Sequence, residues 1–177
     1  MLLSTCIPIL FYISLLKSPK MIKKLSSDTN QELLETLVEI HKRCISLCNS
    51  KRYNKAQIEE WLSTINSQNI KDQLEDTVWL ILEEDKAVVG FAQYSLEDKE
   101  LYQIQIDPKE QGKGYGKELY YYIENIFRKN DIDGISLFAT LNATSFYEKL
   151  GFKSVKKIAF KLLNTKIEMV KMYKELI

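Results

Sequence analysis

Apolar and polar residues alternate along several stretches of the chain, and the clearest alternation lies at residues 101–106. Its apolar face consists of Tyr102, Ile104 and Ile106, and its polar face of Gln103 and Gln105. This period of two predicts a strand with one buried side. Pro108 has no N–H to give to a strand ladder, so the strand should end before it.

The same reading predicts six further strands. They are expected at residues 22–25, 77–83, 87–96, 134–140, 156–163 and 166–174, where β-branched and aromatic residues are frequent. Short polar turns separate 77–83 from 87–96 and 87–96 from the central strand, so these three should be consecutive and antiparallel. Residues 164–165 should form the turn of a last antiparallel pair.

Apolar residues spaced three and four apart predict helices elsewhere. These helices are expected from residue 33 to 48, from 55 to 65 and from 116 to 129. A two-turn helix should follow Asn142, a natural N-cap, and end at Gly151, a natural C-terminal stop. Phe146 and Leu150 lie four apart in it and should face the core.

The order of these elements predicts an α/β (α+β) domain with a mixed, mostly antiparallel sheet of six to seven strands and about four helices. The helix at 116–129 joins two strands, which should therefore be parallel and connected in the right-handed sense. A length of 177 residues and a hydrophobic content of 45% suit one packed domain. We place it at residues 21–177.

A glycine-rich turn precedes the helix at 116–129. Glycines occupy positions 112, 114 and 116, so several backbone N–H groups can turn the same way at the positive end of the helix dipole. This arrangement predicts an anion site that suits a phosphate. The spacing excludes a Walker A loop, because Gly116 and Lys117 are followed by Glu118, and it excludes the dinucleotide fingerprint G-x-G-x-x-G.

Charge and cysteine content narrow the function classes. The chain has 25 basic and 24 acidic residues, so it lacks the strong basic balance expected of a nucleic-acid partner. Three cysteines, Cys6, Cys44 and Cys48, are too few for a disulfide framework and indicate a reducing, cytoplasmic location.

Residues 1–16 are apolar and uncharged, and lysines follow them. The run is short for a membrane span and carries its charge on the wrong side for a secretory signal. We therefore expect residues 1–20 to be an extension outside the fold, with Met21 as a second start, and we keep a weak membrane anchor as the alternative.

His41, Cys44 and Cys48 fall on one stripe of the helix at 33–48. They could suggest zinc, but no further ligand cluster such as C-x-x-C is present and the stripe continues into leucines. Core packing is the preferred interpretation, and we expect no metal.

The central motif resembles the acetyl-CoA-binding motif Q/R-x-x-G-x-G/A of the GNAT superfamily of N-acetyltransferases, through Gln111, Gly114 and Gly116. A second segment, Asn142 to Phe152, resembles the family signature N-A-x-x-F-Y-E-K-L-G-F. The pattern from His41 through Tyr53 to Trp61 is similar to one bacterial branch, in which the first helices cover the acceptor pocket. The resemblance implies the GNAT fold, with the sheet splayed at its central strands.

The resemblance also implies which residues meet the co-substrate acetyl-CoA. The pantetheine arm would contact Ile104, Gln105 and Ile106, with Asn142 beside it. The pyrophosphate would lie on the loop of Gln111, Gly112, Lys113, Gly114, Tyr115, Gly116 and Lys117. Tyr147 would be near the sulfur and is predicted to be the general acid.

The predicted reaction is direct attack of a primary amine, from a small molecule or a peptide, on the acetyl thioester. A backbone N–H near Ile106 would polarise the carbonyl. The base stays open among Glu100, His41 and a water chain, because no acid lies in the strand at 134–140. The alternatives are a coenzyme A-binding module without turnover and a membrane-tethered enzyme, and a homodimer is left open.

Overall fold

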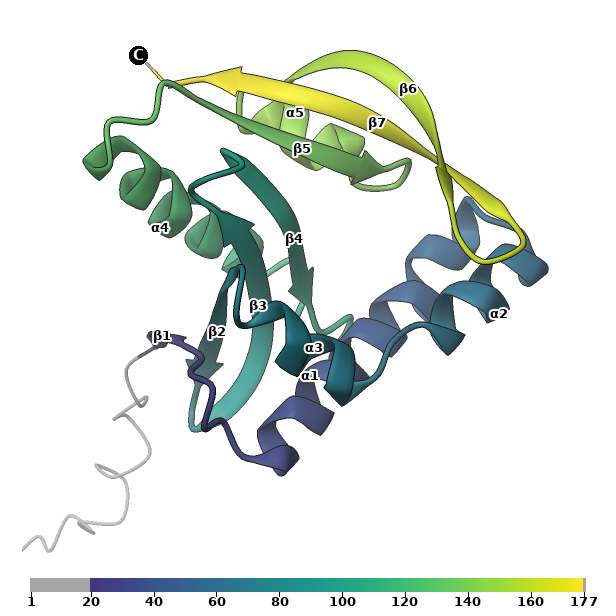
Figure 1. Ribbon diagram of the computed structural model, residues 1–177, viewed down its shortest axis with the longest axis horizontal. Coiled ribbons are helices and arrows are strands. Elements are labelled where there is room, and N and C mark those ends of the chain that lie inside the picture. The colour runs from purple at the N-terminus through teal and green to yellow at the C-terminus, as the bar shows by residue number, and fades with distance from the viewer. Residues whose placement is uncertain (1–19, 177) are drawn as a thin grey trace, which may run out of the picture.

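The computed structural model describes residues 20–176, which form one seven-stranded sheet with helices on both faces (Figure 1). The strands follow the order β1-β2-β3-β4-β5-β7-β6. Their bounds are β1 Met21–Lys24, β2 Val78–Glu84, β3 Ala87–Ser95, β4 Glu100–Ile106, β5 Gly134–Thr140, β6 Lys153–Lys161 and β7 Lys166–Glu175. Apart from residue 20, the predicted extension at residues 1–20 lies outside the described residues.

Five α-helices accompany the sheet. They are α1 Gln31–Leu47, α2 Lys55–Ser63, α3 Ser67–Gln73, α4 Tyr115–Lys129 and α5 Thr144–Lys149, and a 3₁₀ turn, Asn49–Lys51, follows α1. Side-chain caps fix where the first helices begin: Asn30 accepts from the amide of Leu33 at 2.9 Å, and Asn54 and Gln57 form a reciprocal capping box. No helix within residues 20–176 has the length and apolar character needed to cross a membrane.

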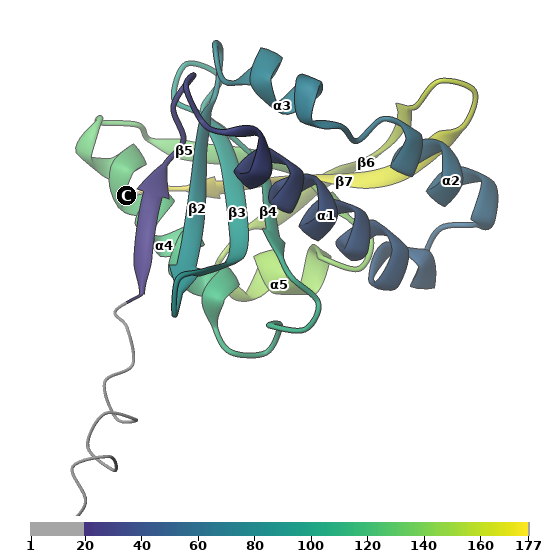
Figure 2. The ribbon, with the colours of Figure 1, turned by 90° about the horizontal axis from the view of Figure 1, so that it is seen from below.

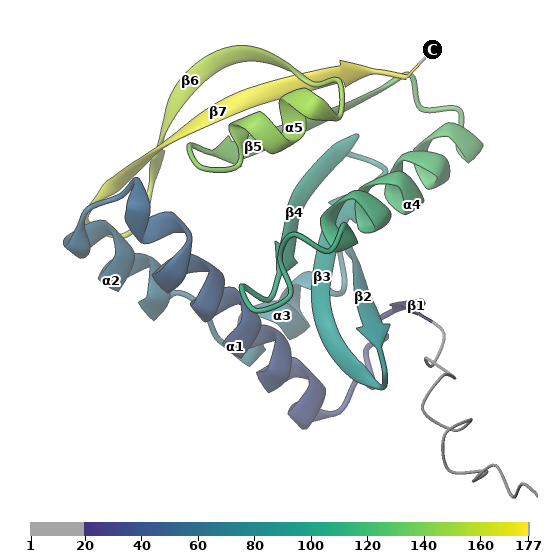
Figure 3. The same ribbon diagram turned by 180° about the vertical axis from the view of Figure 1, so that it is seen from behind.

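The topology confirms the predicted fold class. Every neighbouring pair of strands is antiparallel except β4 and β5. These two strands run parallel, and α4 connects them in the sequence. Alternation along the strands sends side chains to two cores: Trp79, Ile81 and Phe91 pack under α1, whereas Leu80 and Ala92 pack under α4. The α1 and α4 helices consequently cover opposite faces of the sheet (Figures 2 and 3).

The two central strands separate soon after they meet. β4 and β5 pair only at Glu100 and Ser136, and the amide of Ser136 donates to the carbonyl of Lys99 at 2.9 Å. Beyond this point the strands diverge toward the end of β4 near α1 and the glycine turn (Figure 1). This is the predicted splay of the sheet.

A β-bulge lies near the point of separation. Gln103 is opposite Gln93 and Leu101 is opposite Tyr94, so Tyr102 is an extra residue of β4 with no counterpart in β3. A bulge bends its strand and increases its twist, and bulges are frequent next to active sites. The bulge also leaves Glu100 on the same face of β4 as Gln103.

The structure corrects two details of the predicted elements. Helix α3 was not predicted, because Ser67–Gln73 carries mostly polar residues and only Ile70 is buried. Asn142 does not cap α5: the N-cap position is Ala143, without a side-chain hydrogen bond. The predicted stop at Gly151 is confirmed, since this residue has φ +93°.

Gly90 marks a close approach of β3 and β4. A Cβ at this position would lie 2.6 Å from the carbonyl oxygen of Gln105 and 2.5 Å from Cδ1 of Ile106. We expect Gly90→Ala to lower the free energy of unfolding by about 1–3 kcal/mol, because a backbone atom cannot move aside as a side-chain end can. Chemical denaturation measures this, and an unchanged midpoint and slope would contradict it.

Candidate functional site

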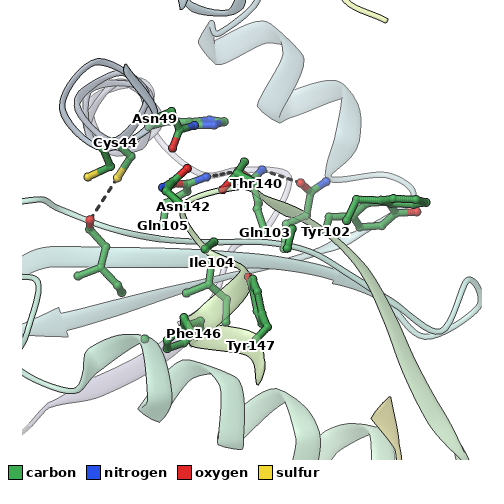
Figure 4. Close-up of a pocket in the computed structure, with 18 of the residues that line it drawn as sticks. Cys44, Asn49, Tyr102, Gln103, Ile104, Gln105, Thr140, Asn142, Phe146 and Tyr147 are labelled. Carbon is green, nitrogen blue, oxygen red and sulfur yellow. Dashed lines mark hydrogen bonds between the residues drawn. The ribbon is translucent and has the colours of Figure 1, made fainter. Parts of the chain in front are cut away.

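The separation of β4 and β5 opens a cleft of about 1250 Å³. Its walls come from β4, the C-terminal end of α1, the loop before α4, helix α5 and the β6–β7 hairpin. Residues far apart in sequence therefore meet around one space, and Figure 4 shows part of its lining. Nearly all the site residues predicted from the sequence border this cleft.

The backbone of β4 faces the cleft at every second residue. The amide of Asp107 donates to the carbonyl of Val89 at 2.9 Å. In an antiparallel pair every second residue bonds to the neighbouring strand, so Gln105 and Gln103 also direct their backbone groups toward β3. The N–H and C=O groups of Ile104 and Ile106 consequently point the other way. The thiol of Cys44 donates a hydrogen bond to the carbonyl oxygen of Ile106 at 3.1 Å, which agrees with this direction.

The glycine turn presents amides at the N-terminal end of α4. Gly112 and Gly114 have φ +84° and +91°, a conformation that glycine adopts at little cost. A Cβ at either position would have no atom within 4 Å. In residues 20–176 the amides of Gly114, Tyr115, Gly116 and Lys117 have no hydrogen-bond acceptor, so this turn can bind an anion.

Two side chains of the turn do not point at the cleft. The ammonium of Lys113 pairs with Glu110 at 2.6 Å, and Lys113 is absent from the cleft lining. The phenol of Tyr115 is buried and bonded to Glu84. Gln111 instead anchors the loop, because its side-chain N–H donates to the carbonyl of Ile106 at 3.2 Å.

Helix α5 brings Asn142 and Tyr147 to the opposite wall. The side-chain oxygen of Asn142 is buried and has no hydrogen-bond partner in the described part of the chain. Tyr147 is 7% exposed and packs against Phe146 and Phe152. Burial raises the pKa of Tyr147 above its ordinary value, so its hydroxyl stays protonated.

Tyr53 fixes the segment that leads to α5. Its hydroxyl donates to the carbonyl of Glu168 on β7 at 2.7 Å and accepts from the amide of Leu141 at 3.1 Å. The family resemblance placed the segments that carry His41, Tyr53 and Trp61 over the acceptor pocket. Trp61 and His41 line the cleft, whereas Tyr53 is buried beside it as a connection between elements.

The three residues on one stripe of α1, His41, Cys44 and Cys48, differ in whether they lie in the core or at the cleft. Cys44 is buried, and burial raises the pKa of its thiol to about 12. Burial lowers the pKa of His41 to about 4, so the imidazole is neutral at neutral pH, and its ring lies edge-on to Phe91. Cys48 is partly exposed and borders the cleft, so core packing holds for Cys44 and not for Cys48.

Glu100 is the carboxylate at the base of the splay. It lines the cleft at the single pairing point of β4 and β5. Burial raises its pKa above the ordinary glutamate value, and the nearby charge of Asp98 adds to this. A carboxyl group poised in this way can accept a proton closer to neutral pH than an exposed one.

A chain of side-chain amides crosses the α1 side of β4, and the sequence analysis missed it. Gln105 donates to Gln103 at 3.3 Å, and Gln103 donates to Gln93 at 2.8 Å. Gln93 donates in turn to Gln73 at 2.9 Å and to Thr77 at 3.0 Å. Gln93, a polar residue inside the buried strand β3, was the available signal.

The far end of the cleft combines an apolar wall with acidic side chains. The apolar wall consists of Trp61, Phe138, Phe160, Leu162, Ile167 and Met169. Asp72, Asp76 and Glu100 contribute carboxylates there. The lysines of the lining, Lys117 and Lys149, belong to the loop side and α5, and Glu110 on the loop side is paired with Lys113. One end of the cleft thus suits an anion and the other a molecule with donor groups. In residues 20–176 no group of three His, Cys, Asp or Glu side chains could hold a metal ion.

Comparison with sequence families gives an independent view of this chain. Residues 49–176 match the family described as "Acetyltransferase (GNAT) domain". The uncharacterized N-acetyltransferase ycf52 of Porphyra purpurea is 28% identical over 131 residues, which cover 67% of this chain and 75% of that protein. The chloroplastic GCN5-related N-acetyltransferase 2 of Arabidopsis thaliana is 31% identical over 75 residues, 41% of this chain, and the match spans only 29% of that relative.

Solved structures share the fold at low sequence identity. A GCN5-related N-acetyltransferase from Rhodopseudomonas palustris has a TM-score of 0.81 and 19% identity, covering 90% of this chain and 98% of that one. The PaiA N-acetyltransferase from Thermoplasma acidophilum, solved in complex with coenzyme A, has a TM-score of 0.73 and 24% identity, covering 89% and 99%. These similarities concern the arrangement of the elements.

Proposed function

The chain belongs to the GNAT acetyltransferase family, and we propose that it transfers the acetyl group of acetyl-CoA to a primary amine of a small molecule or a peptide. The observation that carries this proposal is the cleft between β4 and β5. The unpaired amides of the glycine turn lie at one end of it, and an apolar wall with carboxylates lies at the other. The coenzyme A complex of the structurally similar PaiA protein supports the choice of co-substrate.

The residues of the cleft fit acetyl-CoA. The amides of Gly114 and Gly116 suit the pyrophosphate, and Lys117 adds a positive charge beside them. The outward N–H groups of Ile104 and Ile106 and the carbonyl of Ile104 suit the amide-bearing pantetheine arm, which would pair with β4 as a further strand. The carbonyl of Ile106 already accepts from Cys44 and Gln111. The orphaned oxygen of Asn142 needs a donor that such an arm can supply.

The proposed reaction forms one bond and breaks one. The nitrogen of the neutral amine attacks the thioester carbonyl, the C–N bond forms and the C–S bond breaks. A proton leaves the nitrogen for a base, and the sulfur takes a proton as it departs. A backbone N–H of β4 near Ile106 would donate to the carbonyl oxygen while negative charge develops there.

We assign the proton-accepting role to Glu100, which would receive the proton through water in the cleft because it lies at the opposite end of β4 from Ile106. It lies on the face of β4 that carries Gln103 and Gln105, and its pKa is raised by burial. His41 is a weaker candidate because an imidazole with a pKa of about 4 holds a proton poorly at neutral pH. Tyr147 has the role of proton donor to sulfur, since its buried hydroxyl stays protonated and has no acceptor among residues 20–176.

We expect Gly114→Ala to weaken coenzyme A binding about tenfold, because an L-residue at φ +91° is strained by about 1–2 kcal/mol and its Cβ would stand in the binding space. Isothermal titration calorimetry with coenzyme A measures this. The control is Gly151→Ala, which has φ +93° at the end of α5 and carries the same strain without touching the turn. Equal affinity losses in both variants would contradict the phosphate role.

Tyr147→Phe removes the hydroxyl and keeps the ring contacts with Phe146 and Phe152. We expect kcat for acetyl transfer to fall about 100-fold with coenzyme A affinity unchanged. The assay follows acetyl-CoA consumption with a panel of amines, peptides and aminoglycosides, and Tyr121→Phe on the exposed face of α4 is the control. Full activity of Tyr147→Phe would remove the acid assignment, and coenzyme A binding without turnover of any amine would favour a non-catalytic module.

The pH dependence of kcat/KM tests Glu100. The carboxylate must be ionised to accept a proton, so activity should fall as pH drops through a pKa raised above the ordinary value of about 4.3. We expect Glu100→Gln to lose about 100-fold in kcat/KM and to lack this acidic limb. Glu97→Gln, an exposed carboxyl three residues earlier, should keep the wild-type profile. A limb that persists in Glu100→Gln would assign the base elsewhere.

A further inference from the structure

We propose that the side-chain oxygen of Gln105 accepts a hydrogen bond from the attacking amine, and that a polarised chain of side-chain amides fixes it in this orientation. The inference rests on the proposed acetyl transfer to an amine. It identifies Gln105 as the residue that orients the nucleophile, and Gln103, Gln93 and Thr77 as the residues that position Gln105.

Thr77 sets the direction of the hydrogen bonds along the chain of side-chain amides. Its hydroxyl donates to the backbone carbonyl of Gln73 at 2.6 Å, so its oxygen is left to act as an acceptor. That oxygen accepts from the side-chain nitrogen of Gln93 at 3.0 Å, and the same nitrogen donates to the side-chain oxygen of Gln73 at 2.9 Å. Gln93 must therefore turn its own oxygen toward β4.

Each following amide takes its orientation from the one before it. The oxygen of Gln93 accepts from the nitrogen of Gln103 at 2.8 Å, and the oxygen of Gln103 accepts from the nitrogen of Gln105 at 3.3 Å. Gln93 is only 5% exposed, so water has little access to the middle of the chain. The oxygen of Gln105 is left at the open end, with no donor in the described part of the chain.

Asn49 supplies a second, independent indication of a ligand at this end. It is 7% exposed, lines the same cleft, and its carboxamide makes no hydrogen bond to any residue between 20 and 176. Figure 4 shows Asn49 and Gln105 on one side of β4 and Ile104, Phe146 and Tyr147 on the other. Because Asn49 borders the open cleft, its carboxamide is available to a polar group of a bound molecule.

The chemistry of the attack explains why an oxygen should face the amine. A neutral amine develops positive charge as its nitrogen bonds to the thioester carbon. Aligned amide dipoles polarise one another, and their negative end lies at Gln105. The C-terminal end of α1, which precedes Asn49, contributes the negative end of a helix dipole. A primary amine can donate one N–H to Gln105, and water in the cleft would carry the proton that leaves to Glu100, because the two side chains stand five positions apart along β4.

The test measures kcat/KM for the amine and the affinity for coenzyme A in matched variants. Gln105→Leu should lose about tenfold or more in kcat/KM for the amine. Coenzyme A affinity should be unchanged, because the variant removes only the side-chain amide and keeps the strand backbone that would meet the pantetheine arm. Thr77→Val removes the hydroxyl that orients the amide chain and should lower kcat/KM for the amine about threefold to tenfold. Thr77→Ser keeps the hydroxyl and should have the wild-type kcat/KM. Gln31→Leu, an exposed glutamine at the start of α1 whose partners Glu35 and Ser67 also lie outside the cleft lining, is the control and should match the wild type.

The outcomes separate this inference from the proposed function. A wild type that acetylates amines, together with Gln105→Leu within twofold of it, would overturn the role of Gln105 and leave the acetyl transfer in place. Equal loss in Thr77→Val and Thr77→Ser would overturn the directional role of the hydroxyl. A wild type that binds coenzyme A and acetylates no amine would overturn both proposals. If Gln105→Leu fails to bind coenzyme A, the comparison of Thr77→Val with Thr77→Ser tests the role of the amide chain instead.

Discussion

The structure depends on one interruption of strand pairing. β4 is bonded to β3 along its length but meets β5 only at Glu100 and Ser136. Backbone N–H and C=O groups that lose a strand partner need another one. Cys44 and Gln111 donate to the carbonyl of Ile106, whereas the N–H groups of Ile104 and Ile106 and the carbonyl of Ile104 have no partner in the described part of the chain. The cleft, the direction of the glycine turn and the placing of α5 all follow from this separation.

The sequence predicted the elements that follow from local periodicity. The bounds of α1, α4 and β5 were close to those expected, because each has a clear hydrophobic period and the glycine turn marks where α4 begins. The anion site could also be predicted, since glycine spacing and a helix start are local features. Cys44 was correctly assigned to the core, because a free cysteine in a leucine stripe favours burial.

What the sequence could not predict depends on contacts between distant segments. The amide chain joins Gln73, Gln93 and Gln105, which come from a helix and two strands and share no motif. The apolar wall of the cleft includes Phe160 from β6, far along the chain from β4. Asn142 was read as a helix cap because local propensity favours that role, but the fold leaves its oxygen buried at the cleft.

Tyr53 gives the site a mechanical property. Its hydroxyl joins the first helices, the strand β7 and the segment before α5 through two short contacts. The first helices, β7 and the segment that leads to α5 are thus attached to the same phenol, so these walls of the cleft cannot shift independently.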